Sequence, residues 1–418
     1  MIKFKSEFNK NVFTLIKGTA FAQLIVILIS PILTRLYTPE EFGIFALYSS
    51  LVFITASFST GKYELAIMFP KKKNDALAVM SLSLGILVSI VFCIFLLILG
   101  FNMDIAILLE NQDVAFWLYF LPLSILMAGT YRNLNYFSIR EKKFSQLSTS
   151  KITQSLGTSS TNLIFGFLNF GVFGLVFGNI FGFFISNYIL YRQVIKENLQ
   201  ILLNISRVKI YALARLYIKF PKYDMPASFI NTLSRNIIPI LLVSYFSPVI
   251  AGYYYLTQRV IALPSNIIAS SISDVFRQRA SEDYRKYNNA KDIYISTLKK
   301  LIIISFIPSI ILFLYSKQLF ILIFGANWEI AGQYTQILAP LLFFRFISTP
   351  LSFMFTVVGK QSLNLIGQII FLFGILISFY IGTYYNSDII TITCISFFSS
   401  LFYFIYTIMS YKMALGYK

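Results

Sequence analysis

Long apolar runs recur along this chain, and they limit what it can fold into. A helix needs about 20 predominantly apolar residues to cross a lipid bilayer. Runs of 18 or more such residues lie at 13–34, 43–61, 77–101, 114–137, 152–170, 172–191, 225–246, 249–273, 300–324, 334–358, 362–383 and 389–411. Within 418 residues, these runs leave no room for a large domain outside the membrane. We therefore predict an all-α integral membrane protein with twelve transmembrane helices.

Composition excludes several other classes of protein. Only 12% of the residues are charged, against about 25% in soluble domains, so neither a soluble multidomain enzyme nor a disordered chain is expected. The chain has no His, which excludes His-dependent catalysis and the usual zinc sites. Cys93 and Cys394 both lie inside apolar runs and are interpreted as small hydrophobic residues. We expect neither a metal nor a cofactor.

The basic residues predict the orientation in the membrane. A net charge of +18 could indicate nucleic-acid binding, but membrane proteins also concentrate Lys and Arg in cytoplasmic loops. If the N-terminus is cytoplasmic, 29 of the 35 basic residues face the cytoplasm and two, Arg35 and Lys317, face outward. The other four lie within helices. This distribution favours cytoplasmic termini and argues against nucleic acid.

An internal repeat divides the chain into two similar halves. The segment LYTPEEFGIFAL (36–47) resembles YFSPVIAGYYYL (245–256), and Pro39 lies 209 residues before Pro248. We predict two six-helix lobes, 1–200 and 201–418, joined by a polar cytoplasmic connector at 192–222. Parallel repeats of this kind are typical of transporters, whose substrate site lies near the membrane midplane. Apolar positions in the connector predict an amphipathic surface helix: Ile201, Leu202, Ile205, Val208 and Leu213.

Three arginines are predicted near the membrane midplane. Arg235, Arg259 and Arg345 each lie about ten residues inside a predicted helix, where a cation costs at least about 2.5–3.5 kcal/mol. A buried ion pair is the alternative, but no Asp or Glu is predicted at the same depth. We therefore expect a water-filled cavity that binds an anion. The guanidinium fork matches phosphate oxygens, so a phosphate or diphosphate headgroup is the predicted ligand.

Other polar residues complete the predicted substrate site. Lys17 lies near the inner end of the first helix and could instead reach the headgroups. Polar side chains at helical spacing, for which ordinary interhelical hydrogen bonds are the alternative, include Gln23, Asn231 and Asn266. Acidic residues near helix ends are candidates for ion coupling, without a choice between H⁺ and Na⁺: Glu64, Asp224 and Asp388.

Several segments resemble a known family. These are QLIVILISPILTRLYTPEEFGIFAL (23–47), KYELAIMFPKKKNDA (62–76), KFPKYDMPASFI (219–230) and AGYYYLTQRVIALPSNIIASSISDVFRQRASE (251–282). They resemble Wzx-type polysaccharide flippases of the multidrug/oligosaccharidyl-lipid/polysaccharide exporter superfamily. The resemblance implies two lobes around a central cavity, lined mainly by helices 1, 2, 7 and 8. In that family pattern, Arg35 lies at the outer mouth, where contact with the diphosphate on release and anchoring at the lipid headgroups are the two open alternatives.

The resemblance also implies a substrate and a location. The substrate is an undecaprenyl-diphosphate-linked oligosaccharide, such as an O-antigen repeat unit of lipopolysaccharide, moved across the bacterial inner membrane. Membrane lipids are expected partners, and other polysaccharide assembly proteins are left open. A drug exporter of the same superfamily is one alternative. A membrane-embedded polysaccharide polymerase or ligase is another, although it would need a larger outer loop than those near 102–113 and 325–333.

Overall fold

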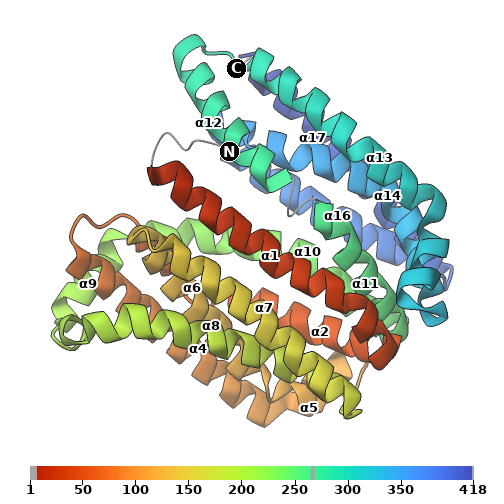
Figure 1. Cartoon of the computed structure of the whole chain (residues 1–418), viewed down its shortest axis with the longest axis horizontal. Helices are drawn as coiled ribbons and strands as arrows, with labels where there is room; N and C mark the ends of the chain where they lie inside the picture. Colours follow the sequence, from red (N-terminus) through yellow and green to blue (C-terminus); the bar gives the residue numbers. More distant parts are fainter. Residues whose placement is uncertain (1–6, 265–268, 417–418) are drawn as a thin grey trace. The chain divides into compact units, whose positions relative to one another are not determined.

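The computed structural model describes residues 7–264 and 269–416, and all regular elements in these ranges are helices (Figure 1). The contacts between Cα atoms divide the chain into two compact units, Met1–Ser244 and Tyr245–Lys418. The two units are defined by contacts between residues. The predicted lobe boundary at 200/201 is defined by the sequence repeat, and it stays a prediction. The two units are described separately below.

The first unit is built from long helices joined by short segments. In chain order its elements are α1 (Glu7–Leu36), α2 (Pro39–Ala56), α3 (Tyr63–Ala66), α4 (Lys73–Leu108), α5 (Val114–Leu118), α6 (Leu121–Arg140), α7 (Phe144–Phe167), α8 (Val172–Leu203), α9 (Arg207–Leu216), the π-helix η1 (Phe220–Asp224) and α10 (Met225–Tyr245). Helix α7 packs on both α1 and α8, and α4, α6 and α8 pack on one another.

The second unit has a similar construction. Its elements are α11 (Pro248–Pro264), α12 (Ser270–Tyr287), α13 (Lys291–Phe324), the 3₁₀ helix η3 (Ala326–Trp328), α14 (Glu329–Leu351), α15 (Met354–Val357), α16 (Gln361–Tyr384) and α17 (Asp388–Ala414). Helix α14 packs on α11, α13 and α17, and α16 packs on α17.

Long helices occupy the predicted spans, which confirms the all-α membrane fold. Within the described ranges, nine helical segments are long and apolar enough to cross a membrane. Helices α2, α7 and α11 are not among them, because α11 has only 17 residues, α7 is rich in Ser and Thr, and α2 begins with Pro-Glu-Glu. The predicted span 249–273 includes residues 265–268, which lie outside the described part. The count of twelve therefore stays a prediction.

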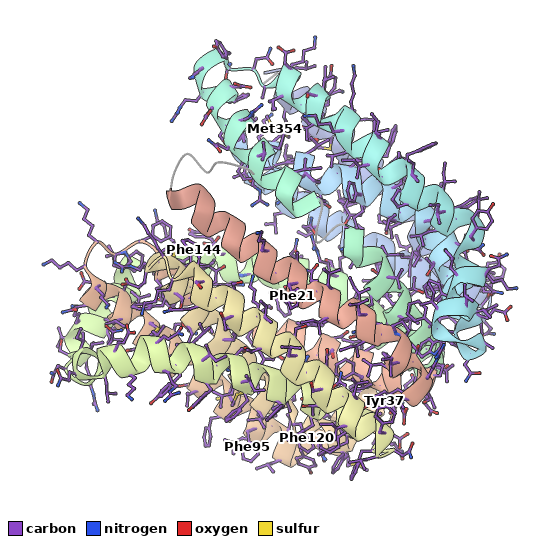
Figure 2. All side chains as sticks on the ribbon, in the orientation of Figure 1. Phe21, Tyr37, Phe95, Phe120, Phe144 and Met354 are labelled. Atoms are coloured by element: carbon purple, nitrogen blue, oxygen red, sulfur yellow. The ribbon has the colours of Figure 1, made fainter. Side chains whose placement is uncertain are left out.

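Large apolar side chains remain exposed on the outside of these helices. Phe21 of α1 and Phe95 of α4 are 54% and 40% exposed, and Figure 2 shows many such side chains along the ribbon. In a soluble protein, apolar surface of this extent would be a liability. On helices of membrane length this apolar surface is expected to contact lipid. A helix can lie in lipid because its backbone N–H and C=O groups are hydrogen-bonded to one another.

The two prolines of the sequence repeat occupy equivalent positions in their helices. Pro39 is the first residue of α2, where Thr38 and Glu41 form a reciprocal capping box. Pro248 is the first residue of α11, and the hydroxyl of Ser247 accepts a hydrogen bond from the backbone N–H of Ile250 at 3.4 Å. A proline at the first helical position loses no hydrogen bond. Both prolines therefore begin a helix without the loss of a hydrogen bond.

Small residues bring α1, α7 and α8 close together. Added to Gly178 of α8, a Cβ atom would overlap the side-chain amide of Asn162 on α7. The hydroxyl of Tyr37, just after α1, donates to the backbone carbonyl of Asn162 at 2.6 Å, and Ser155 Oγ donates to the carbonyl of Ala22 at 2.6 Å. Close backbone approach through glycine and interhelical hydrogen bonds are typical of membrane helices.

The connector differs from its prediction. Helix α8 continues to Leu203, so Ile201 and Leu202 belong to its last turn rather than to a separate surface helix. On α9, Val208 is 80% exposed while Leu213 is partly buried, so these two residues do not share a face. The prediction of one amphipathic helix through all five apolar positions was therefore wrong. The reason is that a helix boundary at Asn204–Ser206 interrupts the pattern.

Candidate functional site

The first unit contains a buried carboxylate, Glu64, in the short helix α3. The chain reaches α3 through two consecutive residues in the left-handed region, Gly61 at φ 58° and Lys62 at φ 60°. Glycine adopts this conformation easily, whereas a lysine there is uncommon and is held by its surroundings. The reversal directs Glu64 into the unit, where the residue is only 1% exposed.

Two neighbours on the same segment bind the carboxylate. Thr60 Oγ1 donates a hydrogen bond to Glu64 Oε2 at 2.5 Å, and Lys62 Nζ lies 3.9 Å from Glu64 Oε1. The side chain of Lys62 is itself only 13% exposed. Burial lowers the pKa of the Lys62 ammonium from its ordinary value, and the charge of Glu64 opposes that shift.

Helix α6 and the π-helix η1 contribute further charges. Arg132 and Tyr136, one turn apart on α6, both lie within electrostatic reach of Glu64. Lys62 in turn interacts with Asp224, the exposed last residue of η1. One buried carboxylate is therefore shared by two cations, Lys62 and Arg132. We call Thr60, Lys62, Glu64 and Arg132 the Glu64 cluster.

The charges of the Glu64 cluster favour binding of an anion over binding of a cation. An incoming anion would compete with Glu64 for Lys62 and Arg132, whereas an incoming cation would have to displace both of them. Across residues 7–264 and 269–416, no group of three or more Cys, Asp or Glu side chains could hold a metal ion.

The predicted arginines lie on three different helices. Arg235 is exposed in the middle of α10, one turn after the partly buried Asn231. Arg259 is partly buried on α11 and interacts with Tyr255. Arg345 is partly buried on α14 and interacts electrostatically with Tyr254 of α11.

Within the second unit, Arg345 belongs to a polar group. The hydroxyl of Tyr254 accepts a hydrogen bond from Gln258 Nε2 at 2.9 Å, and Tyr254 also interacts with Tyr403 of α17. Three helices thus bring a guanidinium, an amide and two phenols together. These are groups that can hydrogen-bond phosphate and sugar hydroxyls.

The remaining predicted residues have different environments. Lys17 and Arg35 are both exposed on α1. Gln23, also on α1, is partly buried, and its Oε1 atom has no hydrogen-bond partner among the described residues. Asn266 lies outside the described part of the chain.

The three acidic candidates separate into two groups. Glu64 and Asp224 approach the same lysine in the first unit. Asp388 is the first residue of α17 in the second unit and accepts a hydrogen bond from the hydroxyl of Tyr334. An acidic residue at a helix N-terminus also has a favourable interaction with the helix dipole, which gives Asp388 a structural role.

Sequence reasoning selected neither Arg132 nor Lys62 for the site. Both were counted as basic residues of the cytoplasmic side. The Arg132–Tyr136 spacing, which puts both side chains on one helix face, was the available signal. The approach of α6 to α3 could not be seen in the sequence.

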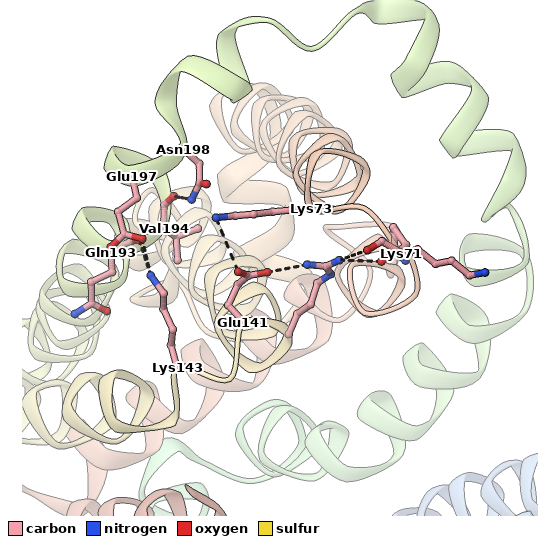
Figure 3. Close-up of polar contacts among 10 residues, drawn as sticks. Lys71, Lys73, Glu141, Lys143, Gln193, Val194, Glu197 and Asn198 are labelled. Atoms are coloured by element: carbon pink, nitrogen blue, oxygen red, sulfur yellow. Dashed lines mark hydrogen bonds and ion pairs between the residues drawn. The ribbon is translucent and has the colours of Figure 1, made fainter. Parts of the chain in front are cut away.

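A second network of ion pairs covers the polar ends of the first unit (Figure 3). Glu141 binds Arg140 at 2.7 Å and Lys73 at 3.9 Å, while Lys143 binds Glu197 at 2.6 Å. These contacts connect the start of α4, the turn from α6 to α7 and the end of α8. Because the Glu197 side chain is 54% exposed, its pair contributes little stability by itself.

Comparison with known proteins identifies the family and the fold. A family model described as polysaccharide biosynthesis protein matches residues 32–332. A search of curated proteins finds no match.

Solved structures share the fold at low sequence identity. The lipid II flippase MurJ in an inward closed conformation has a TM-score of 0.72 at 16% identity, over 97% of this chain and 87% of that one. An inward-facing multidrug resistance transporter of the MATE family and the MOP superfamily has a TM-score of 0.66 at 15% identity, over 95% and 93%. A MOP superfamily transporter from Pyrococcus furiosus has a TM-score of 0.61 at 16% identity, over 96% and 94%.

Proposed function

Because the chain belongs to the family of polysaccharide biosynthesis proteins, we propose that it is a flippase for a lipid-linked oligosaccharide. Its fold is that of transporters of the MOP superfamily, which include a lipid II flippase and multidrug transporters. The family indicates a role in polysaccharide synthesis, and the fold indicates transport, so we propose that the protein transports the glycan. It carries the glycan, still attached to its lipid, from the leaflet of synthesis to the opposite leaflet.

The observation that carries this proposal is the presence of partly buried arginines on membrane-length helices. Arg132 and Arg345 both lie within segments that are long and apolar enough to span the membrane. A guanidinium inside a membrane-spanning helix is expensive unless it faces water or a polar partner. It also binds a diphosphate through two parallel hydrogen bonds, which suits a lipid diphosphate headgroup.

The specific substrate we propose is an undecaprenyl-diphosphate-linked repeat unit, such as that of O-antigen, in the bacterial inner membrane. Both chain termini would then be cytoplasmic. The residues proposed to contact the diphosphate and the sugars are Lys17, Gln23, Arg35, Asn231, Arg235, Arg259, Asn266 and Arg345. Lys62 and Arg132 of the Glu64 cluster are proposed as further cations for the diphosphate. Glu64, Asp224 and Asp388 are proposed for ion coupling, if transport is coupled to an ion.

The proposed mechanism is alternating access assisted by the membrane potential. An inside-negative potential is worth about 2.3 kcal/mol per charge per 100 mV, so outward movement of an anionic diphosphate is downhill. Flipping in reconstituted vesicles should accelerate under an imposed inside-negative potential. Equal rates with and without the potential would remove this part of the mechanism.

The function itself is tested with a fluorescent undecaprenyl-diphosphate oligosaccharide in vesicles that contain the purified protein. Flipping is measured as loss of protection from a membrane-impermeant quencher. Arg345→Ala should slow flipping about tenfold or more, the loss of one charge-assisted contact, and Arg345→Lys should recover part of it. Arg279→Ala, an exposed position on α12, is the matched control and should flip normally. No flipping by the unmodified protein would refute the proposal.

The same assay separates the alternatives. A polymerase or ligase would change the length of the labelled glycan, which gel mobility detects. A drug exporter would instead move lipophilic cations. The structure does hold a buried carboxylate, as a cation exporter needs, but Lys62 and Arg132 already share it. That arrangement favours an anionic substrate.

A further inference from the structure

The connector helix α9 has an apolar face that the protein leaves uncovered. None of its residues is buried, and Val208, Tyr211 and Leu216 are 80%, 60% and 67% exposed. At about 100° per residue these three side chains lie within an arc of about 140°. The same exposed side of the helix also carries Arg207 and Arg215. A helix that faced only water would carry polar residues at these positions.

Basic residues around this face outnumber the acidic ones, which include Asp75 of α4 and the exposed Asp224 of η1. From Asn198 to Tyr223 the sequence contains no Asp or Glu. Lys209, on the inner face, is paired with Asp75 of α4 at 2.6 Å. The other basic residues of this stretch are all exposed: Arg207, Arg215, Lys219 and Lys222.

Some of these cations lie against aromatic rings. The guanidinium of Arg215 lies 4.6 Å from the ring centre of Tyr211 and donates to its hydroxyl at 2.7 Å. Lys222 Nζ lies 5.4 Å from the ring centre of Tyr223. Tyrosine with a neighbouring cation is typical of the membrane interface, where an apolar ring and a charged group meet at headgroup level.

The opposite side of the connector is attached to the first unit. Tyr63 Oη donates to the carbonyl of Ala214 at 2.9 Å. Phe69 contacts Tyr217 and Phe220, with ring centres 6.5 and 5.6 Å apart. Tyr63 directly precedes Glu64 in α3, so the connector supports the helix that carries the buried carboxylate.

We propose that the exposed face of α9 docks on an anionic lipid surface. Val208, Tyr211 and Leu216 enter the boundary between headgroups and acyl chains, and the four exposed cations bind lipid phosphates. Charge complementarity selects this occupant, because exposed apolar side chains interspersed with a clear excess of positive charge fit a negatively charged bilayer. Docking holds α9 against α3 and thereby stabilises the position of Glu64. The inference does not depend on the proposed transport function.

The test uses the full chain in lipid nanodiscs and needs no substrate. Cys93 and Cys394 are first replaced by Ala. A single fluorescent label is then attached at Val208→Cys on α9 or, as a matched control, at Ser281→Cys on an exposed position of α12. Quenching by acrylamide reports exposure to water, and quenching by a nitroxide on the lipid acyl chain reports insertion. Discs contain phosphatidylcholine alone or with increasing phosphatidylglycerol.

We expect the α9 label to lose acrylamide quenching and gain nitroxide quenching as phosphatidylglycerol increases, while the α12 label stays in water. Each basic residue near an anionic surface contributes about a fivefold preference. The triple variant Arg207→Gln, Arg215→Gln, Lys219→Gln should therefore favour the docked state about a hundredfold less than the parent at the same phosphatidylglycerol fraction. A control that removes the same charge from α12, Arg279→Gln, Arg285→Gln, Lys286→Gln, should behave as the parent.

Three outcomes would overturn the inference. A label on α9 that stays accessible to acrylamide in all discs means that the face does not meet lipid. Equal insertion with and without phosphatidylglycerol means that lipid charge is not recognised. Protection that occurs in native membranes but not in any lipid disc means that a protein covers α9 instead.

Discussion

Removal of the charge on Glu64 should destabilise the first unit strongly, because the carboxylate and its lysine partner are both largely buried. Glu64→Gln keeps the shape of the side chain but removes the negative charge that Lys62 and Arg132 share. At the observed 3.9 Å, an effective dielectric constant of about 20 gives roughly 4 kcal/mol of attraction. Breaking a buried pair from one side costs about 3–5 kcal/mol, because a charge is left without its partner. Since Lys62 keeps some exposure, we expect the free energy of unfolding to fall by about 3 kcal/mol.

A matched control separates burial from distance. Glu197→Gln removes a carboxylate that is closer to its lysine, 2.6 Å from Lys143 Nζ, but whose side chain is 54% exposed. An exposed pair is worth at most about 1 kcal/mol. Both variants are compared by equilibrium unfolding in mixed micelles with increasing sodium dodecyl sulfate. An equal or larger loss for Glu197→Gln would refute the argument that burial decides.

The double variant Lys62→Met, Glu64→Gln completes the cycle. When Met replaces Lys62, removal of the Glu64 charge leaves one buried cation, Arg132, without its partner, whereas the single variant leaves two. We expect the loss in the double variant to be smaller than the sum of the single losses by about 2 kcal/mol, within the range for contacting charges. Strict additivity would mean that Lys62 and Glu64 do not stabilise each other.

Three further substitutions test the packing of the first unit by thermal unfolding. Gly178→Ala should cost about 1–3 kcal/mol, because its Cβ would overlap Asn162 and push α8 from α7. Gly85→Ala is the opposite case, since a Cβ there meets no atom within 4 Å, and it should stabilise α4 by about 0.5–1 kcal/mol. Tyr37→Phe should cost about 0.5–1.5 kcal/mol, because the carbonyl of Asn162 in α7 loses the additional hydrogen bond from the Tyr37 hydroxyl. No change in Tyr37→Phe would show that this hydrogen bond is dispensable.

The sequence was a good guide to where the helices lie and a poor guide to where they end. Apolar runs mark the stretch that lipid can cover, and no other structure satisfies the backbone there. Helix α4 extends from Lys73 to Leu108 around a predicted span of 77–101, and α13 begins at Lys291 rather than near residue 300. The additional turns are polar or lie beyond a kink, so hydropathy does not report them.

Only part of the candidate site could be predicted from the sequence. Depth within an apolar run selected Arg235, Arg259 and Arg345 as candidates, because this depth depends only on local residue order, and their role as a site stays a prediction. The Glu64 cluster depends on two features that local order does not show. One is the left-handed reversal at Gly61 and Lys62, and the other is the approach of α6, which brings Arg132 to Glu64 across 68 positions.

The Glu64 cluster also gives opposite expectations for stability and for ligand binding. A phosphate that enters the cluster competes with one carboxylate, and the displaced carboxylate keeps its hydrogen bond from Thr60. Glu64→Gln removes that competitor, so the same variant that unfolds more easily should bind an anionic headgroup more tightly. We expect a lower KM for the labelled lipid-linked oligosaccharide in Glu64→Gln and an unchanged KM in Glu197→Gln. An increased KM in Glu64→Gln would mean that the carboxylate assists the substrate, as it would in a cation-coupled carrier.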